Sequence, residues 1–127
     1  MTEYGKALMK NPTIRKLGQK VGHGTITAAE MNCLCGEYGK IAGRCIGDQL
    51  LAEYPNGQAS EDDVRVIASP VLREMHKFIS EITVEMINAQ YEKAGIGIKA
   101  VVPEYNVQWE DELVKDLSQR SFEDELE

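Results

Sequence analysis

The stretch from Thr27 to Tyr54 constrains the fold most, because it has the pattern of one long amphipathic helix. Its apolar residues recur at steps of three and four, so a helix gathers them on one face. Thr27 and Glu30 form a capping box that fixes where the helix begins. A turn starting at Pro55 ends it. We therefore expect a long central helix here, with the remainder of the chain packed around it.

A row of small residues runs along one flank of this predicted helix. Gly39, Gly43 and Gly47 follow Cys35 at intervals of four residues. A glycine inside a helix costs about 1 kcal/mol relative to alanine, so several of them require a compensating gain. A ridge without side chains allows a second helix backbone to approach closely. Two explanations stay open: close helix packing inside this domain, and a contact between helices of separate copies.

Helical periodicity continues through most of the other segments. A short helix is predicted after the N-cap Ser60 and ends before Ser69-Pro70, where a second long helix starts. Gly95 marks the end of that helix. The expected fold is mainly α: a helical bundle of two long helices, at about 27–54 and 70–93, plus short helices at 2–10, 13–21 and 107–118, with one extended segment near 96–102.

The extended segment 96–102 alternates and is rich in β-branched residues, and a turn at 103–106 follows it. A single strand cannot satisfy its own edges, so the segment either lies across the helices or pairs with a strand of another molecule. Together with the glycine row it defines the candidate interaction residues. These are Gly39, Gly43, Gly47, Ile96, Ile98, Val101, Pro103, Tyr105 and Trp109.

Length and charge narrow the organisation of the chain. The 127 residues suit one domain, and the net charge of −7 is concentrated from Glu110 onward, where eight acidic and two basic residues lie. We expect a helical domain over 1–109 and an acidic C-terminal helix or tail over 110–127, partly disordered and solvated. The absence of a basic footprint argues against direct nucleic-acid binding. No apolar run reaches the ~20 residues of a membrane span, and no leader is recognisable, so we expect a cytoplasmic protein.

The sequence offers no set of residues that points to catalysis or to a metal. Cys35 and Cys45 are ten residues apart on the predicted helix, about 15 Å at 1.5 Å per residue, which is too far for a disulfide. Cys33 and Cys35 point to nearly opposite faces. Reduced thiols packed as small hydrophobes are the expectation, and His76 is expected at the edge of an apolar stripe. We predict no catalytic, cofactor-binding or metal-binding residues, and a structural or interaction protein in place of an enzyme.

Four stretches, in order along the chain, resemble a known family. They are YGKALMKNPTIRKL, GHGTITAAE, ASPVLREMHKFIS and AGIGIKAVVPEYN, which are spread over the sequence up to about Asn106. The set resembles the N-terminal part of a family of minor head (minor capsid) proteins of tailed phages from Firmicutes prophages. In that family more sequence follows, whereas this chain continues into the acidic tail, so any activity of the later part does not transfer. The resemblance supplies no catalytic residues.

The resemblance implies a virion structural protein near the portal or inner capsid, acting as a homo-oligomer or by docking on portal or capsid protein. The alternative is a small phage-encoded inhibitor or regulator of the anti-defence type, whose acidic tail mimics nucleic acid and which binds a host protein in the bacterial cytoplasm.

Overall fold

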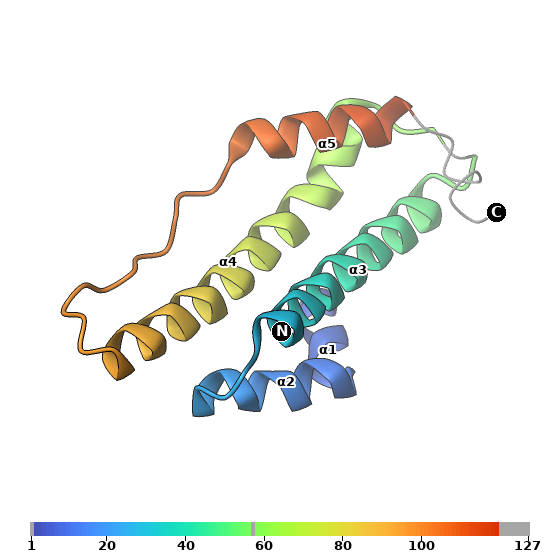
Figure 1. Cartoon of the computed structure of the whole chain (residues 1–127). Coiled ribbons are helices and arrows are strands. Elements are labelled where there is room, and N and C mark those ends of the chain that lie inside the picture. Colours follow the sequence, from blue (N-terminus) through green and yellow to red (C-terminus); the bar gives the residue numbers. More distant parts are fainter. Residues whose placement is uncertain (1, 57, 120–127) are drawn as a thin grey trace.

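The computed structural model describes residues 2–56 and 58–119, and within these ranges the chain forms five helices and no strand. Figure 1 shows α3 and α4 as two long rods side by side, with the shorter helices around them. The predicted mainly α bundle is confirmed. The helices are α1 (Glu3–Lys10), α2 (Pro12–His23), α3 (Ala28–Glu53), α4 (Glu61–Lys93) and α5 (Val107–Gln119).

Both long helices begin at the capping boxes that the sequence indicates. The Thr27 hydroxyl accepts from the Glu30 amide at 3.1 Å, and the Glu30 carboxylate accepts from the Thr27 amide at the same distance. Ser60 and Asp63 make the same reciprocal pair at the start of α4. The start of α2 differs from the predicted residue 13, because Asn11 is its N-cap and the helix begins at Pro12. Pro12 fits the first turn, and the Asn11 side chain accepts from the amide of Ile14.

The predicted break at Ser69-Pro70 is wrong, since α4 runs without interruption for 33 residues. Proline removes one helical hydrogen bond and costs about 3 kcal/mol in a helix interior. Here Pro70 is exposed and Val66, whose carbonyl loses its donor, is 75% exposed, so water can reach this stretch of backbone. Buried residues on both sides of the proline, Ala68 and Val71 among them, hold the two halves against the same core.

The core lies between the two long helices and their neighbours. α1 and α2 pack against α3, and α2 also reaches α4. Leu34 and Val64, one on each long helix, are fully buried. The Tyr4 hydroxyl, on α1, donates to the backbone carbonyl of Tyr38 at 3.0 Å, and burial raises the pKa of Tyr4. α5 packs on α4 and makes little direct contact with α3.

The connection from α4 to α5 is extended and forms no strand. In Figure 1 it runs back along the outside of α4. The Ala100 amide donates to the Asn88 side chain at 2.7 Å, and the ring Nε2 of His76 lies 3.1 Å from the carbonyl oxygen of Pro103. The apolar side chains of the connection face outward, and the side chain of Ile98 is 69% exposed. The expected extended segment is present; its pairing with another molecule stays a prediction.

α5 spans the boundary that the sequence suggested between residues 109 and 110. It begins at Val107, and both Glu110 and Val114 are buried against the bundle. The expectation that the acidic residues from Glu110 onward are solvated is therefore wrong for Glu110 itself. The part of the expected tail beyond residue 119 lies outside the described residues.

Candidate functional site

An apolar groove separates α3 from α5 and has a volume of about 660 Å³. Its α3 side carries the glycine row, and its α5 side carries Trp109, Leu113 and Leu117. Leu72 and Met75 of α4 line it as well. A concave surface of this size, lined by large apolar side chains, is typical of a binding site. The groove exists because α5 rests on α4, one helix away from α3.

The glycine row is bare in this structure. A Cβ atom placed on Gly39, Gly43 or Gly47 would have no atom of residues 2–56 or 58–119 within 4 Å outside its own helix backbone and chain neighbours. Close packing by another helix within these ranges therefore does not explain the three glycines. The other explanation, a contact with another molecule, remains a prediction.

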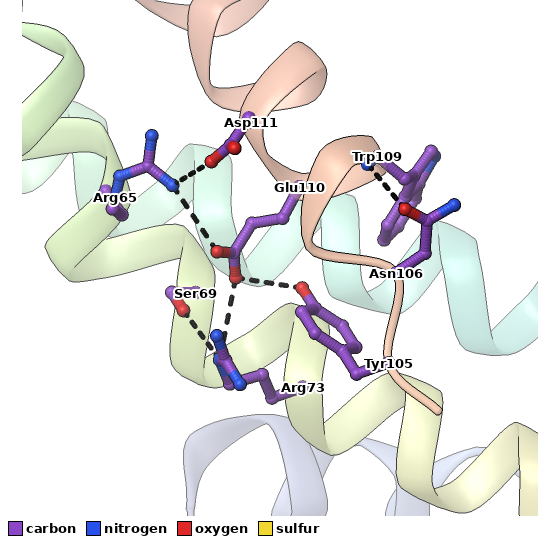
Figure 2. Close-up of polar contacts among 8 residues, drawn as sticks. All are labelled: Arg65, Ser69, Arg73, Tyr105, Asn106, Trp109, Glu110 and Asp111. Atoms are coloured by element: carbon purple, nitrogen blue, oxygen red, sulfur yellow. Dashed lines mark hydrogen bonds and ion pairs between the residues drawn. The ribbon is translucent and has the colours of Figure 1, made fainter. Parts of the chain in front are cut away.

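The α5 wall of the groove is held by a polar cluster centred on Glu110. Figure 2 shows its carboxylate between two arginines of α4 and the ring hydroxyl of Tyr105. The Tyr105 hydroxyl donates to Glu110 at 2.8 Å, and Arg65 and Arg73 lie 3.4 and 3.7 Å from its oxygens. Arg65 also bonds Asp111 at 2.6 Å. We call Arg65, Arg73, Tyr105 and Glu110 the α5 latch.

Electrostatics favour the charged form of Glu110 although it is only 2% exposed. Burial by itself would raise the pKa of this carboxyl. Hydrogen bonds from Ser69 and Tyr105 and the charges of the two latch arginines outweigh burial, so the pKa of Glu110 is lowered. A buried carboxylate is costly unless it is paired and hydrogen-bonded, and here it is both. The latch thus fixes α5 on α4 in one position.

Tyr105 connects the latch to the extended segment. Its ring lies under the guanidinium of Arg73, 4.6 Å from the ring centroid, a cation–π arrangement. The His76 ring meets it edge-on at 5.3 Å. Burial and the hydrogen bond to Glu110 raise the pKa of Tyr105, so it remains a proton donor. His76 lies half-buried at the edge of this cluster.

The groove is lined by one basic and one acidic residue, Arg44 and Asp48, and both lie on α3. Lys40 is one turn before Arg44, and on α5 Glu112 follows Trp109 by three residues. These four charged residues are exposed, and none forms an ion pair with another residue in 2–56 or 58–119. Arg44 also borders a second hollow of about 620 Å³, between α3 and α1.

The structure brings some of the predicted interaction residues together and leaves others apart. Gly39, Gly43, Gly47 and Trp109 line the groove. Tyr105 belongs to the latch behind it, and the carbonyl of Pro103 meets His76. The exposed residues Ile96, Ile98 and Val101 lie on the extended segment and do not line the groove.

Sequence reasoning missed Glu110, although a signal was present. Glu110, Leu113, Val114 and Leu117 follow the three- and four-residue spacing of a buried face, so Glu110 holds the first position of the apolar stripe. An acidic residue at such a position predicts a buried charge with basic partners. The two arginines of α4 could not be assigned as those partners before the packing of α5 on α4 was known.

The thiols and histidines offer no second site. The three cysteines are free; Cys33 is exposed, which corrects the expectation that it packs as a small hydrophobe, whereas burial raises the pKa of the half-buried Cys35 and Cys45. Among the described residues no group of three His, Cys, Asp or Glu is placed to hold a metal ion. No helix in this part of the chain is long and apolar enough to cross a membrane.

Comparison of the chain with protein-family models, with curated proteins and with solved structures found no match.

Proposed function

We propose that this chain acts by binding other proteins, as a head-associated structural component of a tailed-phage particle. The observation that carries the proposal is the groove between α3 and α5, with a row of glycines on its α3 side at which an added Cβ would meet no described atom within 4 Å beyond the backbone of its own helix. Glycines in a helix lower its stability, and an open apolar surface favours association. A partner that covers the groove buries the apolar surface, and that burial compensates for the lower stability of the helix. The family resemblance of the first 106 residues supplies the kind of partner, a portal or capsid protein.

The groove is suited to a binding role more than to a chemical one. Its lining is mainly aliphatic and aromatic, with Arg44 and Asp48 as its charged residues. The buried carboxylate beside it, Glu110, is engaged by Tyr105 and two arginines and serves to position α5.

The test begins with the genes on either side of the coding sequence and the head proteins that they encode. Purified chain is immobilised and challenged with the neighbouring portal and major capsid proteins. We expect binding that Gly43→Leu abolishes and that Gly18→Leu, on an equally open position of α2, leaves intact. Flanking genes unrelated to phage heads, with no head protein bound, would contradict the proposal. Specific binding of a host defence protein at the groove would favour the inhibitor alternative.

A further inference from the structure

The chain leaves α5 at one end of the groove. Leu117 lines the groove, and two residues later Gln119 ends α5. α3 and α5 run in the same direction in Figure 1, so their carboxyl ends lie at the same end of the groove. Residues 120–127, which lie outside the described ranges, are joined to α5 at that end.

This segment is long enough to reach along the groove. On α3 the lining runs from Gly39 to Leu51, which is about 18 Å at 1.5 Å per residue. Residues 120–127 span at most about 26 Å, at roughly 3.3 Å per residue. Because the segment is joined to one wall, it meets the groove at an effective concentration on the order of millimolar, whatever the protein concentration. Any other occupant competes with it.

The apolar side chains of the segment suit the lining of the groove. The sequence of residues 120–127 is RSFEDELE, with two large apolar residues, Phe122 and Leu126. The groove offers aliphatic and aromatic side chains on α5 and on α4, and the bare glycine row on α3 leaves room for large side chains beside them. Removing Phe122 and Leu126 from water against this lining favours binding.

The charges favour the α3 side of the groove for this segment. Residues 120–127 carry four acidic side chains and one basic one. On α3, the exposed Lys40 and Arg44 outnumber the single acidic residue Asp48, and neither forms an ion pair within residues 2–56 or 58–119. α5 instead presents the acidic Glu112 and Asp116. The acidic segment is therefore attracted by the helix with the glycine row and repelled by α5, which orients it in the groove.

We propose that residues 120–127 bind in the groove of their own chain, with Phe122 and Leu126 against the glycine row, and that a head protein displaces them when it binds. The segment then regulates the groove by competition. This regulation rests on the proposed binding role of the groove. If the segment fills the groove in nine of ten molecules, the dissociation constant for a head protein is roughly tenfold higher than that of an open groove.

Trp109 reports on the segment without any partner. It is the only tryptophan, and it lines the groove. We replace Phe122 and Leu126 together by serine in the full chain and measure quenching of Trp109 fluorescence by acrylamide. We expect stronger quenching and an emission shift to longer wavelength, because Trp109 becomes open to water. Met9→Ser, which changes a residue of α1 that is 60% exposed, is the control and should leave both unchanged.

Equal quenching in the unaltered chain and the double variant overturns the proposal. So does quenching that rises when the unaltered chain is diluted, because the occupant would then be another copy. The second measurement is binding of the neighbouring head protein, which the double variant should bind with a dissociation constant roughly tenfold lower. Stronger quenching with no head protein bound by either chain would support the segment in the groove and contradict the proposed function, so the two failures are distinguishable.

Discussion

At the scale of single residues, the glycines of this chain fall into two kinds. Gly24 has a φ of +68° at the end of α2, and its carbonyl accepts from the Lys93 amine at 2.9 Å. Its backbone requires glycine, since other residues are strained in the left-handed region. Gly43 has ordinary helical geometry and open space where a Cβ would be. The backbone of the fold requires glycine at position 24, whereas it does not require glycine at position 43.

Alanine substitution separates the two kinds. Gly43→Ala should raise the free energy of unfolding by about 0.5–1 kcal/mol, because alanine favours the helix and meets no neighbour. Gly24→Ala should lower it by about 1 kcal/mol. Urea denaturation at a concentration at which the chain is monomeric measures both. Destabilisation by Gly43→Ala under those conditions would indicate a close intrachain contact at the groove.

Also at the residue scale, the hydroxyl of Tyr105 contributes one hydrogen bond to a buried charge. Removing it in Tyr105→Phe should cost about 1–3 kcal/mol, the range for hydrogen bonds to charged groups and for leaving a buried group unsatisfied. Amide hydrogen exchange should show the loss first in α5. If α5 amides keep their protection while α1 and α2 lose theirs, the hydroxyl does not anchor α5.

At the scale of elements, the starts of both long helices were predictable because they are set locally, although the start at Ser60 was assigned to a separate short helix. Thr27 with Glu30, and Ser60 with Asp63, are reciprocal caps that work within one turn. The break at Pro70 was predicted wrongly, because local rules do not include the core packing that carries α4 past the proline. The bare glycine row was visible in the sequence, whereas the α5 wall opposite it was not, because its position depends on two arginines about forty residues away along the chain.

The latch should make the attachment of α5 sensitive to acid. The pKa of Glu110 is lowered in the folded chain, so its carboxylate stabilises the fold fully above its ordinary pKa of 4.5. That contribution is lost as the pH falls below 4.5 and through the lowered value. Trp109, the only tryptophan, sits on α5 and reports its position by fluorescence. We expect an acid transition in Trp109 emission.

Glu110→Gln serves as the matched variant for this transition. It removes the titrating group and should weaken the attachment of α5 to α4 already at neutral pH, with a smaller acid transition. Carboxylates in the two capping boxes titrate in the same range, and the pKa values of Glu30 and Asp63 are lowered too. These capping-box carboxylates are present in the unaltered chain and in Glu110→Gln. The difference between the two acid transitions therefore isolates the contribution of Glu110. Identical acid transitions in both would assign the effect to the caps.

At the scale of the whole molecule, the described part of the chain is a helical bundle with one uncovered face. α1 and α2 cover one side of α3, and α5 covers α4, but no element in the described ranges covers the glycine flank of α3. Exposed apolar residues on the extended segment 96–102 add to the uncovered surface. A protein that functions by association has a use for such a face, since apolar surface exposed in one chain is buried in the assembly.

The most direct measurement compares folding with association in one variant, Gly43→Leu. We expect a thermal midpoint equal to or above that of the unaltered chain, because the leucine meets open space and favours the helix. We also expect the variant to lose the binding to portal or capsid protein that the unaltered chain shows. A variant that unfolds, or one that associates as strongly as before, would contradict the claim that the bare flank of α3 exists for another molecule.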